Sequence, residues 1–323
     1  MKWFLPLVPL ASLLLTGTAL AAPAVVASTK PVHSLVSAVM AGVAEPVLLV
    51  KGTASPHDYS LRPSDAAALE SADIVFWTGH GMELFLADAL ATLSTQAQTV
   101  ELAESEGIEL LPMREGGAFE AHAHEDGHDH GHDGHDHEGH DHEDHAGHDH
   151  GEGEGDMHFW LDPENAKLMV AEIARVLAAA DPENEAAYAA NAAAEIEELG
   201  ALTAEIDAML ADVKGKPFLV FHDAYQYFER RFGLEVAGSI TVSPEAMPGA
   251  ARVEELRARV IELGATCVFA EPNFEPAIVN MIVEGTEAKA GVLDPEGSAL
   301  GEGPDLYADL LRGIASGLAD CLN

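Results

Sequence analysis

"KPFLVFHDAYQYFERRFGLEVAGSI" (residues 216–240) is an apolar run, then a helical pattern, then a second apolar run. This alternation is typical of α/β units with parallel strands. It continues to the end of the chain. It predicts strands over 216–221, 234–240, 265–272 and 288–295, and helices over 223–232, 249–263, 276–287 and 305–319. We therefore expect the second half of the chain to form a lobe with a mostly parallel four-stranded sheet.

The first half of the chain has the same pattern from Ala24 onward. It predicts strands over 24–29, 46–52, 73–79 and 98–102, and helices over 32–44, 64–71 and 83–92. The predicted fold class is therefore α/β, with two similar lobes whose sheets are flanked by helices.

A long helical segment separates the two halves. Residues 163–213 are rich in Ala, Glu and Leu, and Asp181 with Pro182 provides an N-cap and a proline at the first helical position. A helix from Pro182 to about Asp212 would be about 45 Å long and would link the lobes. The predicted division is a signal peptide at 1–21, an N-terminal lobe at 22–180, a linking helix at 181–213 and a C-terminal lobe at 214–323.

The amino-acid composition favours one class of ligand over others. The chain has 323 residues, of which 48% are hydrophobic and 22% charged, which is typical of globular proteins. Its 55 acidic residues against 16 basic ones give a formal net charge of -39. This charge argues against nucleic acids and anionic membrane surfaces as partners and favours cations. Part of the excess acidity could instead keep an exported protein soluble.

The N-terminus "MKWFLPLVPLASLLLTGTALA" has a basic residue, an apolar stretch and small residues before Ala22, the pattern of a cleaved signal peptide. We expect export to a periplasm. Pro6 and Pro9 interrupt the apolar stretch, and no later segment offers about 20 uninterrupted apolar residues. No cysteine lies near the cleavage site to carry a lipid. We therefore predict a soluble protein.

Cys267 and Cys321 are the only cysteines. In an exported chain an isolated pair most often forms one disulfide, which we predict here. Closing a loop of this size would stabilise the fold by about 4 kcal/mol on the chain-entropy model. The rival interpretation, two thiolate metal ligands, fits neither the compartment nor the spacing.

Four polar residues are expected at one cleft. In open parallel sheets, ligands bind at the carboxyl ends of the strands. His222 directly follows "PFLVF", Asp294 ends "AKAGVL", His57 lies in the loop after "PVLLV", and His158 precedes the helix that starts near Pro163. Three imidazoles and one carboxylate suit Zn²⁺ better than Mg²⁺ or Ca²⁺, and also admit Cu²⁺, Ni²⁺ and Co²⁺.

Each of these residues also has a structural interpretation. A single histidine at a strand end can simply be hydrogen-bonded, and Asp294 before Pro295 could be a turn residue. His80, at the end of the third strand of the first lobe, could reach the rim of the cleft, whereas His33 is interpreted as structural. Four aromatic residues are expected either around the cleft or in the core: Trp77, Trp160, Tyr225 and Phe228.

Five motifs together resemble one family. They are "SPHDYSLRPSD", "MHFWLDPENA", "FHDAYQYFERRFGL", "ATCVFAEPNF" and "GVLDPEGS". In this order they resemble the metal-binding lipoprotein and zinc-uptake (ZnuA-type) family of ABC-transporter substrate-binding proteins, over essentially the whole mature chain. The resemblance implies two α/β lobes joined by one long helix, with a metal between them, and transfer of Zn²⁺ to a membrane permease.

The resemblance also implies a ligand set. It assigns His57, His158 and His222 as ligands, with Asp294 in the usual acidic fourth position. Manganese relatives have a carboxylate in place of His222, so the chain resembles a zinc member. Some zinc relatives have an acidic residue just before the first ligand, where this chain has Pro56. The fourth ligand is therefore Asp294 or water. The two cysteines match a disulfide of zinc relatives.

A histidine-rich tract covers about residues 115–155 and contains 12 of the 17 histidines. They are His122, His124, His128, His130, His132, His135, His137, His140, His142, His145, His148 and His150. The tract has too few apolar residues to fold alone, so we expect a mobile loop that binds several divalent ions weakly. It could capture Zn²⁺, sense an excess, or accept metal from a periplasmic metallochaperone. It could also be an unselected insertion.

Two other classes of function compete with transport. A zinc hydrolase also uses three histidines with one open position. Outside the histidine-rich tract the sequence has no His-Glu-x-x-His motif, and nothing places Glu83 as a base. A histidine-rich zinc buffer would need only the tract and would leave the two lobes unexplained. We therefore predict a monomeric solute-binding component of a zinc transporter, not an enzyme.

Overall fold

The computed structural model of the chain describes residues 22–114, 119, 155–241, 248–274 and 277–323. The predicted signal peptide and the twelve histidines of the tract lie outside these residues. Within them, no helix has the length and apolar character needed to cross a bilayer.

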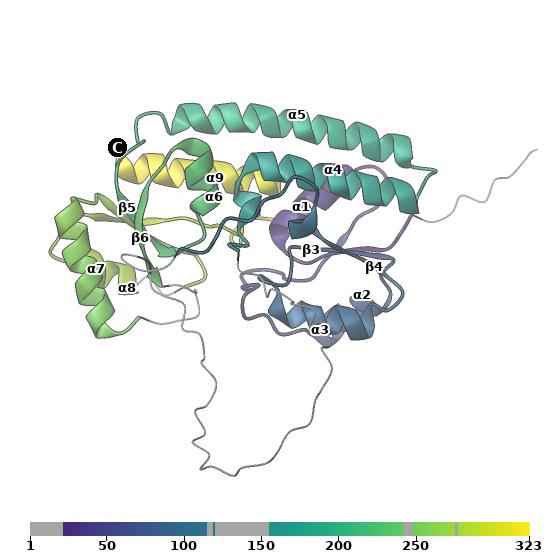
Figure 1. Ribbon diagram of the computed structural model, residues 1–323, viewed down its shortest axis with the longest axis horizontal. Coiled ribbons are helices and arrows are strands. Elements are labelled where there is room, and N and C mark those ends of the chain that lie inside the picture. The colour runs from purple at the N-terminus through teal and green to yellow at the C-terminus, as the bar shows by residue number, and fades with distance from the viewer. Residues whose placement is uncertain (1–21, 115–118, 120–154, 242–247, 275–276) are drawn as a thin grey trace, which may run out of the picture.

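The described strands form two four-stranded sheets (Figure 1). The first has the order β2-β1-β3-β4 and the second the order β6-β5-β7-β8, and every pairing is parallel. The strands are β1 (Val25–Ala27), β2 (Val47–Leu48), β3 (Ile74–Trp77), β4 (Gln98–Glu101), β5 (Phe218–His222), β6 (Val236–Thr241), β7 (Cys267–Ala270) and β8 (Lys289–Val292). The two sheets have the same strand order, which confirms the predicted fold class.

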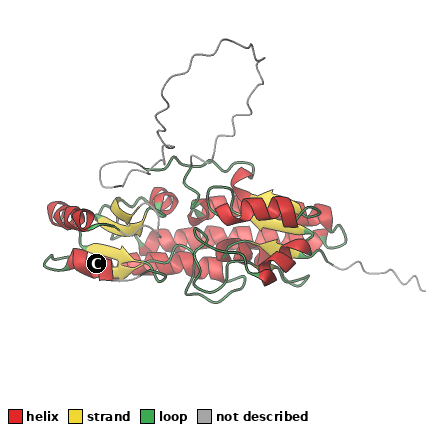
Figure 2. Cartoon of the chain, turned by 90° about the horizontal axis from the view of Figure 1, so that it is seen from below, coloured by secondary structure: helices red, strands yellow, loops and turns green. Residues whose placement is uncertain are grey.

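Helices cover both faces of each sheet (Figure 2). They are α1 (Lys30–Val39), α2 (Pro63–Glu70), α3 (Leu84–Leu93), α4 (Pro163–Ala180), α5 (Glu185–Met209), α6 (Gln226–Phe232), α7 (Ala250–Leu263), α8 (Ala277–Val283) and α9 (Leu306–Leu322), with 3₁₀ turns at Leu102–Glu104 and Phe159–Leu161. Because both faces are covered, the central strands are apolar on both sides. In β5, Phe218 and Val220 face one apolar cluster, while Leu219 and Phe221 face another.

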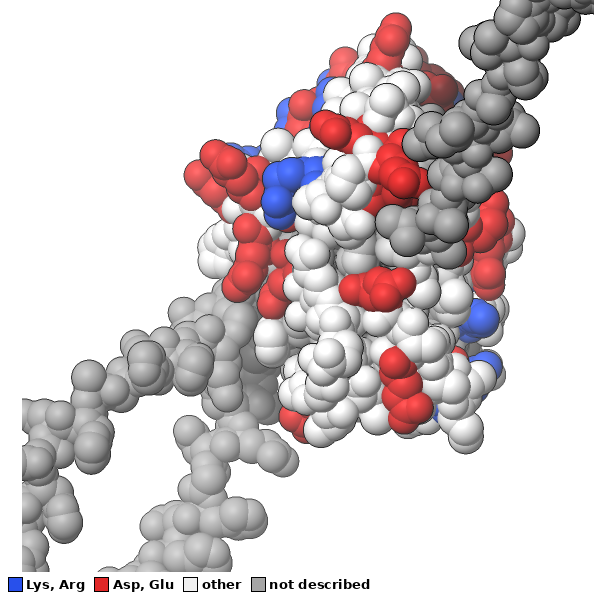
Figure 3. Space-filling model, turned by 90° about the vertical axis from the view of Figure 1, so that its right-hand side faces the viewer, with Lys and Arg blue, Asp and Glu red and all other residues white. Residues whose placement is uncertain are grey.

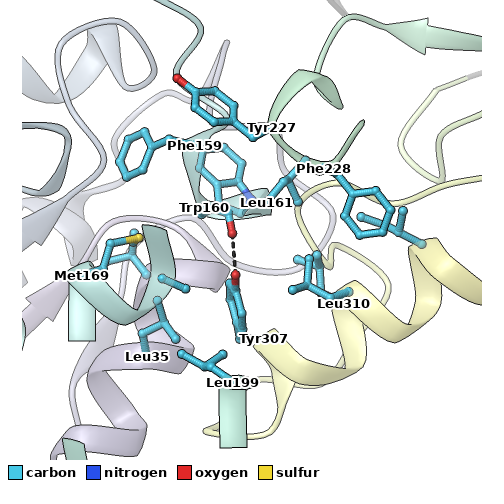
Figure 4. Close-up of a cluster of buried hydrophobic side chains, with 14 of the residues drawn as sticks. Leu35, Phe159, Trp160, Leu161, Met169, Leu199, Tyr227, Phe228, Tyr307 and Leu310 are labelled. Carbon is cyan, nitrogen blue, oxygen red and sulfur yellow. Dashed lines mark hydrogen bonds between the residues drawn. The ribbon is translucent and has the colours of Figure 1, made fainter. Parts of the chain in front are cut away.

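One large hydrophobic core joins the lobes. It contains residues of α1 and α4 from the first half together with residues of α9 from the second. At its centre lie Trp160 and Tyr307, whose hydroxyl donates a hydrogen bond to the Trp160 carbonyl (Figure 4). The Trp160 indole in turn donates to the Pro295 carbonyl. Packing and hydrogen bonds therefore hold the two lobes against each other.

The long helix α5 extends over both lobes (Figure 1). It begins at Glu185 and not at Pro182, so the expected start was wrong. Asp181 ends α4 instead, and its carboxylate accepts hydrogen bonds from Asn184 and the Tyr188 hydroxyl. A residue before proline is biased away from helical backbone angles, which explains the break. The 25 residues of α5 span about 37 Å.

Cys267 in β7 and Cys321 in α9 form a disulfide, with 6.1 Å between their Cα atoms, which confirms the predicted pair. Acidic side chains are more widespread than basic ones on the face at the first-lobe end of the molecule (Figure 3), as the composition led us to expect.

Candidate metal centre

Three histidines from separate segments meet between the lobes. His222 is the last residue of β5, His57 lies in the loop after β2, and His158 immediately precedes the 3₁₀ turn that leads into α4. One ring nitrogen from each lies within 4.8 Å of the other two. The side chains of His57, His158 and His222 are 19%, 8% and 2% exposed. Of the four residues that the carboxyl-end rule selected, these three lie together.

The spacing of the closest pair fits a shared ion. The Nε2 atoms of His158 and His222 are 3.2 Å apart. Two nitrogens bound tetrahedrally to one zinc at 2.0–2.1 Å would be about 3.3 Å apart. The two Nε2 atoms are therefore already separated by nearly the distance that binding to one zinc ion requires.

Buried carboxylates orient these two histidines. His158 Nδ1 lies 2.8 Å from Asp156 Oδ1, and His222 Nδ1 lies 2.6 Å from Glu271 Oε1. A carboxylate only accepts hydrogen bonds, so each Nδ1 donates and each Nε2 presents its lone pair. Two lone pairs that face each other at 3.2 Å repel unless a cation lies between them. This arrangement favours a metal site over a pair of structural histidines.

His57 differs from the other two because it has no such carboxylate on its Nδ1 in the described structure. Burial, followed by the proximity of His158 and His222, lowers the pKa of His57 well below its usual value. Its Nε2 is buried and accepts or donates no hydrogen bond among the described residues. A neutral imidazole with an open nitrogen can bind a metal ion at neutral pH.

Neither Asp294 nor Glu296, two residues later, is part of the three-histidine group, and Asp294 is held by hydrogen bonds within its own turn. Its carboxylate accepts hydrogen bonds from the backbone N–H groups of Ser298 and Ala299 and from the Ser298 hydroxyl. These bonds close a turn, as in the structural interpretation of this residue. A second acidic residue of the turn lies nearer to the histidines: Glu296 Oε1 is 3.9 Å from His57 Nε2.

The other histidines and Glu83 lie elsewhere. His80 is paired through Nδ1 with Glu101 at 2.9 Å and its side chain is 66% exposed. His33 bonds to the Pro46 carbonyl, in agreement with a structural role. Glu83 is fully buried, and its carboxylate accepts bonds from Ser28 and from backbone N–H groups. Burial raises the pKa of Glu83. These contacts make Glu83 a structural residue.

The four aromatic residues expected near the cleft or in the core are all buried, and they lie in two different hydrophobic clusters. Trp160, Tyr225 and Phe228 belong to the core that joins the lobes, and the Trp160 ring lies 5.3 Å from the His158 ring. Trp77 packs in a separate cluster on the other face of the first sheet.

Asp156 and Glu271 were not singled out from the sequence. A signal exists for each, since Glu271 directly follows a buried strand and Asp156 lies two residues before His158. The acidic composition offers too many such candidates for position alone to select these two.

The histidines line a small cavity of about 180 Å³, together with Met82, Met113, Met157, Phe119, Arg114 and five other residues. Drug-sized ligands occupy cavities of roughly 300–1,000 Å³. This cavity therefore suits an ion with a few waters better than an organic substrate.

The fold and the site define a class, a two-lobed protein that binds a transition metal between α/β halves. The family described as "Zinc-uptake complex component A periplasmic" (ZnuA) matches residues 25–321. A "High-affinity zinc uptake system protein ZnuA" of Brucella suis is 55% identical over 311 residues, covering 93% of this chain and 91% of that protein. This chain therefore belongs to the ZnuA family, whose members are zinc-binding components of uptake systems and not enzymes.

Solved structures share the fold. One titled "Crystal structure of ZnuA" has a TM-score of 0.74 at 24% identity, covering 94% of this chain and all of the other. The Zn(II)-bound ZnuA-like domain of Streptococcus pneumoniae AdcA has a TM-score of 0.67 at 24% identity, covering 92% of this chain and 99% of that domain. At this identity the likeness supports the fold alone.

Proposed function

We propose that this chain binds one Zn²⁺ tightly between His57, His158 and His222 in the periplasm and delivers it to the membrane permease of an ABC transporter. The observation that carries this proposal is the convergence of three imidazoles within 4.8 Å, two of them oriented by buried carboxylates. Family membership supports zinc as the cargo and the periplasm as the compartment.

The fourth ligand comes from the turn after β8 or from water. In the ligand set implied by the sequence it is Asp294. Because three neutral imidazoles leave the full charge of the ion uncompensated, one carboxylate would reduce the charge of the buried site from +2 to +1. Such a reduction favours burial of the ion in a medium of low dielectric constant.

Calorimetric titration of the mature chain with Zn²⁺ tests the site. We expect one dominant tight equivalent for the wild type and none for the His57→Ala/His158→Ala/His222→Ala variant. His33→Ala is the matched control, because that histidine lies outside the group. A triple variant that keeps one high-affinity equivalent would contradict the proposal.

The histidine-rich tract is proposed as an accessory element that captures zinc, senses its excess or receives it from a metallochaperone. Two described residues at its N-terminal side support a place near the site. Arg114 and Phe119 line the cavity, and Arg114 donates hydrogen bonds to Asp223, the neighbour of His222. A tract attached there could pass ions to the cavity over a short distance.

Deleting residues 116–152 separates the accessory role from the primary site. The deletion variant should lose the weak zinc equivalents and keep the tight one, because the cleft histidines are held by the fold and are preorganised. Loss of the single tightest site in this variant would show that the tract supplies essential ligands.

A further inference from the structure

We propose that Gln226 and Tyr227, which belong to the second lobe, position the metal ligand His158 of the first lobe. The inference rests on the proposed zinc site and concerns how one of its ligands is held. It starts from Asp156, the carboxylate beside His158. Asp156 accepts hydrogen bonds from the first turn of α6, one at its side chain and one at its backbone carbonyl. Both Asp156 and Gln226 line the cavity of the three histidines.

Asp156 is a buried acidic residue, and its side chain is 5% exposed. Its Oδ1 accepts hydrogen bonds from the His158 ring at 2.8 Å and from the His158 N–H at 3.0 Å, and its Oδ2 accepts one from Gln226 Nε2 at 3.2 Å. A buried carboxylate is costly unless its oxygens are hydrogen-bonded, so Gln226 helps to fix the direction of Asp156. The direction of Asp156 in turn sets the tautomer and the ring orientation of His158.

The Gln226 amide is suited to hold Asp156 because both hydrogens of its NH₂ group have acceptors. Nε2 lies 3.2 Å from Asp156 Oδ2 and 3.1 Å from the Pro112 carbonyl oxygen. Since both partners are acceptors, the NH₂ group and not the amide oxygen must face them. Pro112 pairs with Gly155, the residue before Asp156, in an antiparallel bridge. Gln226 therefore joins α6 to two first-lobe segments at the point where they meet.

Tyr227 holds the backbone of the same two segments. Its hydroxyl donates a hydrogen bond to the Asp156 carbonyl at 2.7 Å and accepts one from the Leu111 N–H at 2.8 Å. The Leu111 carbonyl accepts a hydrogen bond from the Asp156 N–H at 2.7 Å. Because Tyr227 is only 3% exposed, loss of its hydroxyl would leave these backbone groups without a partner in a largely buried place. Gln226 thus fixes the side chain of Asp156, and Tyr227 fixes its backbone.

These contacts make the orientation of His158 depend on the position of the second lobe. Asp156 and His158 come from the first lobe, whereas the donors Gln226 and Tyr227 come from α6, which follows the ligand His222 closely. A movement of α6 away from the first lobe would break these hydrogen bonds and free Asp156 to turn toward water. His158 would then lose its orienting partner. Separation of the lobes would therefore weaken zinc binding through the orientation of His158 as well as through the distances between ligands.

A second contact between α6 and the first lobe provides a matched control. Arg231 donates hydrogen bonds to both carboxylate oxygens of Asp162, at 2.6 and 2.8 Å. Asp162 is the N-cap of α4, where its carboxylate accepts a hydrogen bond from the Glu164 N–H. The Arg231–Asp162 pair thus joins the same helix to the same lobe without passing through the carboxylate that orients His158.

Zinc affinity of the full mature chain, measured by competition with a chelator, tests the inference. Gln226→Leu and Tyr227→Phe should each weaken zinc binding by about three- to tenfold, less than the roughly 10- to 100-fold expected for Asp156→Ala, which removes the direct partner of His158. In the Asp156→Ala background, Gln226→Leu should cause no further loss, because Gln226 acts through the Asp156 carboxylate. The control Arg231→Met should bind zinc as tightly as the wild type.

Three results would overturn the inference. The first is wild-type zinc affinity in both Gln226→Leu and Tyr227→Phe. The second is a full effect of Gln226→Leu in the Asp156→Ala background, which would mean that Gln226 acts on the ion directly. The third is an equal loss in Arg231→Met, which would mean that any weakened contact between the lobes has this effect.

In all three cases a single tight zinc equivalent in the wild type would leave the proposed function intact. A wild type without such an equivalent would refute the proposed function and the inference together. Urea unfolding of each zinc-free variant shows whether a loss of affinity reflects a loss of folding. A loss of affinity that is matched by a loss of folding in Gln226→Leu and in Tyr227→Phe would also count against a positioning role.

Discussion

The two lobes each place a buried carboxylate beside the end of their central strand, but they use it differently. In the first lobe, Glu83 Oε1 accepts a hydrogen bond from the Ser28 hydroxyl, just after β1, at 2.6 Å. In the second, Glu271 Oε1 accepts from His222 Nδ1, at the end of β5, also at 2.6 Å. Because β1 and β5 hold the same place in sheets of the same strand order, the two pairs are topological counterparts.

The two pairs differ in what the donor side chain can still bind after it has donated its hydrogen bond to the carboxylate. A serine hydroxyl uses its only proton on Glu83, and that carboxylate also accepts the N–H groups of Thr78 and Gly79, so the pair fixes a loop. An imidazole has a second nitrogen, which His222 presents to the cleft. One residue type at the end of a central strand thus distinguishes a structural pair from a metal-binding one.

Substituting alanine for His222 or for Ser28 is the strongest test of this difference between the lobes. His222→Ala removes a metal ligand, so zinc affinity should fall by more than the roughly hundredfold that an outer hydrogen-bonding partner contributes. Ser28→Ala should leave zinc affinity unchanged. Competition with a chromogenic zinc chelator measures both. Equal losses in the two variants would mean that the lobes contribute alike and that the comparison is wrong.

Replacing the carboxylates of Glu271 and Glu83 by neutral amides tests whether the two have different roles. Glu271→Gln should weaken zinc binding about 10- to 100-fold, because the amide no longer fixes the His222 tautomer as firmly. Glu83→Gln should leave zinc affinity unchanged and lower the unfolding temperature of the zinc-free protein, since the NH2 of the glutamine amide cannot accept the hydrogen bonds that the replaced carboxylate oxygen accepts. Chelator competition and thermal unfolding give the two readings. A Glu83→Gln variant with weakened zinc binding would contradict the separation of roles.

Much of the fold followed from the sequence because the alternation of apolar runs and helical patterns reports burial directly. The predicted sheets were confirmed, whereas the start of α5 was wrong, because Pro182 looks like a helix start and here follows the end of another helix. The edge strand β2 is limited to Val47–Leu48 although the apolar run around it is longer. Local pattern does not determine which residues of an apolar run pair with a neighbouring strand.

The site was only partly predictable, for a related reason. The ends of strands are fixed by topology, so His222 and the loop histidine His57 could be placed at one cleft. Which acidic side chain turns toward them depends on hydrogen bonds within the turn, and Asp294 and Glu296 are only two residues apart. Sequence position does not resolve such a choice.

The smallest effect, a change of stability with pH, is expected at Glu195. This residue lies in α5, which packs against both lobes, and is far in sequence from Glu83 and Glu271. Burial, and then the nearby carboxylates of Glu198 and Asp305, raise the pKa of Glu195 to about 7. A raised pKa in the folded state gives stability that is present below the unfolded pKa and lost as pH rises through the folded pKa. The contribution of Glu195 should therefore decline between about pH 4.5 and 7.

The Glu195→Gln substitution should remove this loss of stability at higher pH. We expect the variant to be more stable than the wild type by about 1 kcal/mol at pH 8, after discounting for partial exposure, and equal to it near pH 4.5. Urea unfolding of the zinc-free protein at both pH values measures the difference, with the exposed Glu197→Gln as control. Zinc affinity should be unchanged, because the substitution alters stability and leaves the His222 and Ser28 pairs intact. A stability difference between wild type and Glu195→Gln that is the same at both pH values would assign the effect to something other than titration of Glu195.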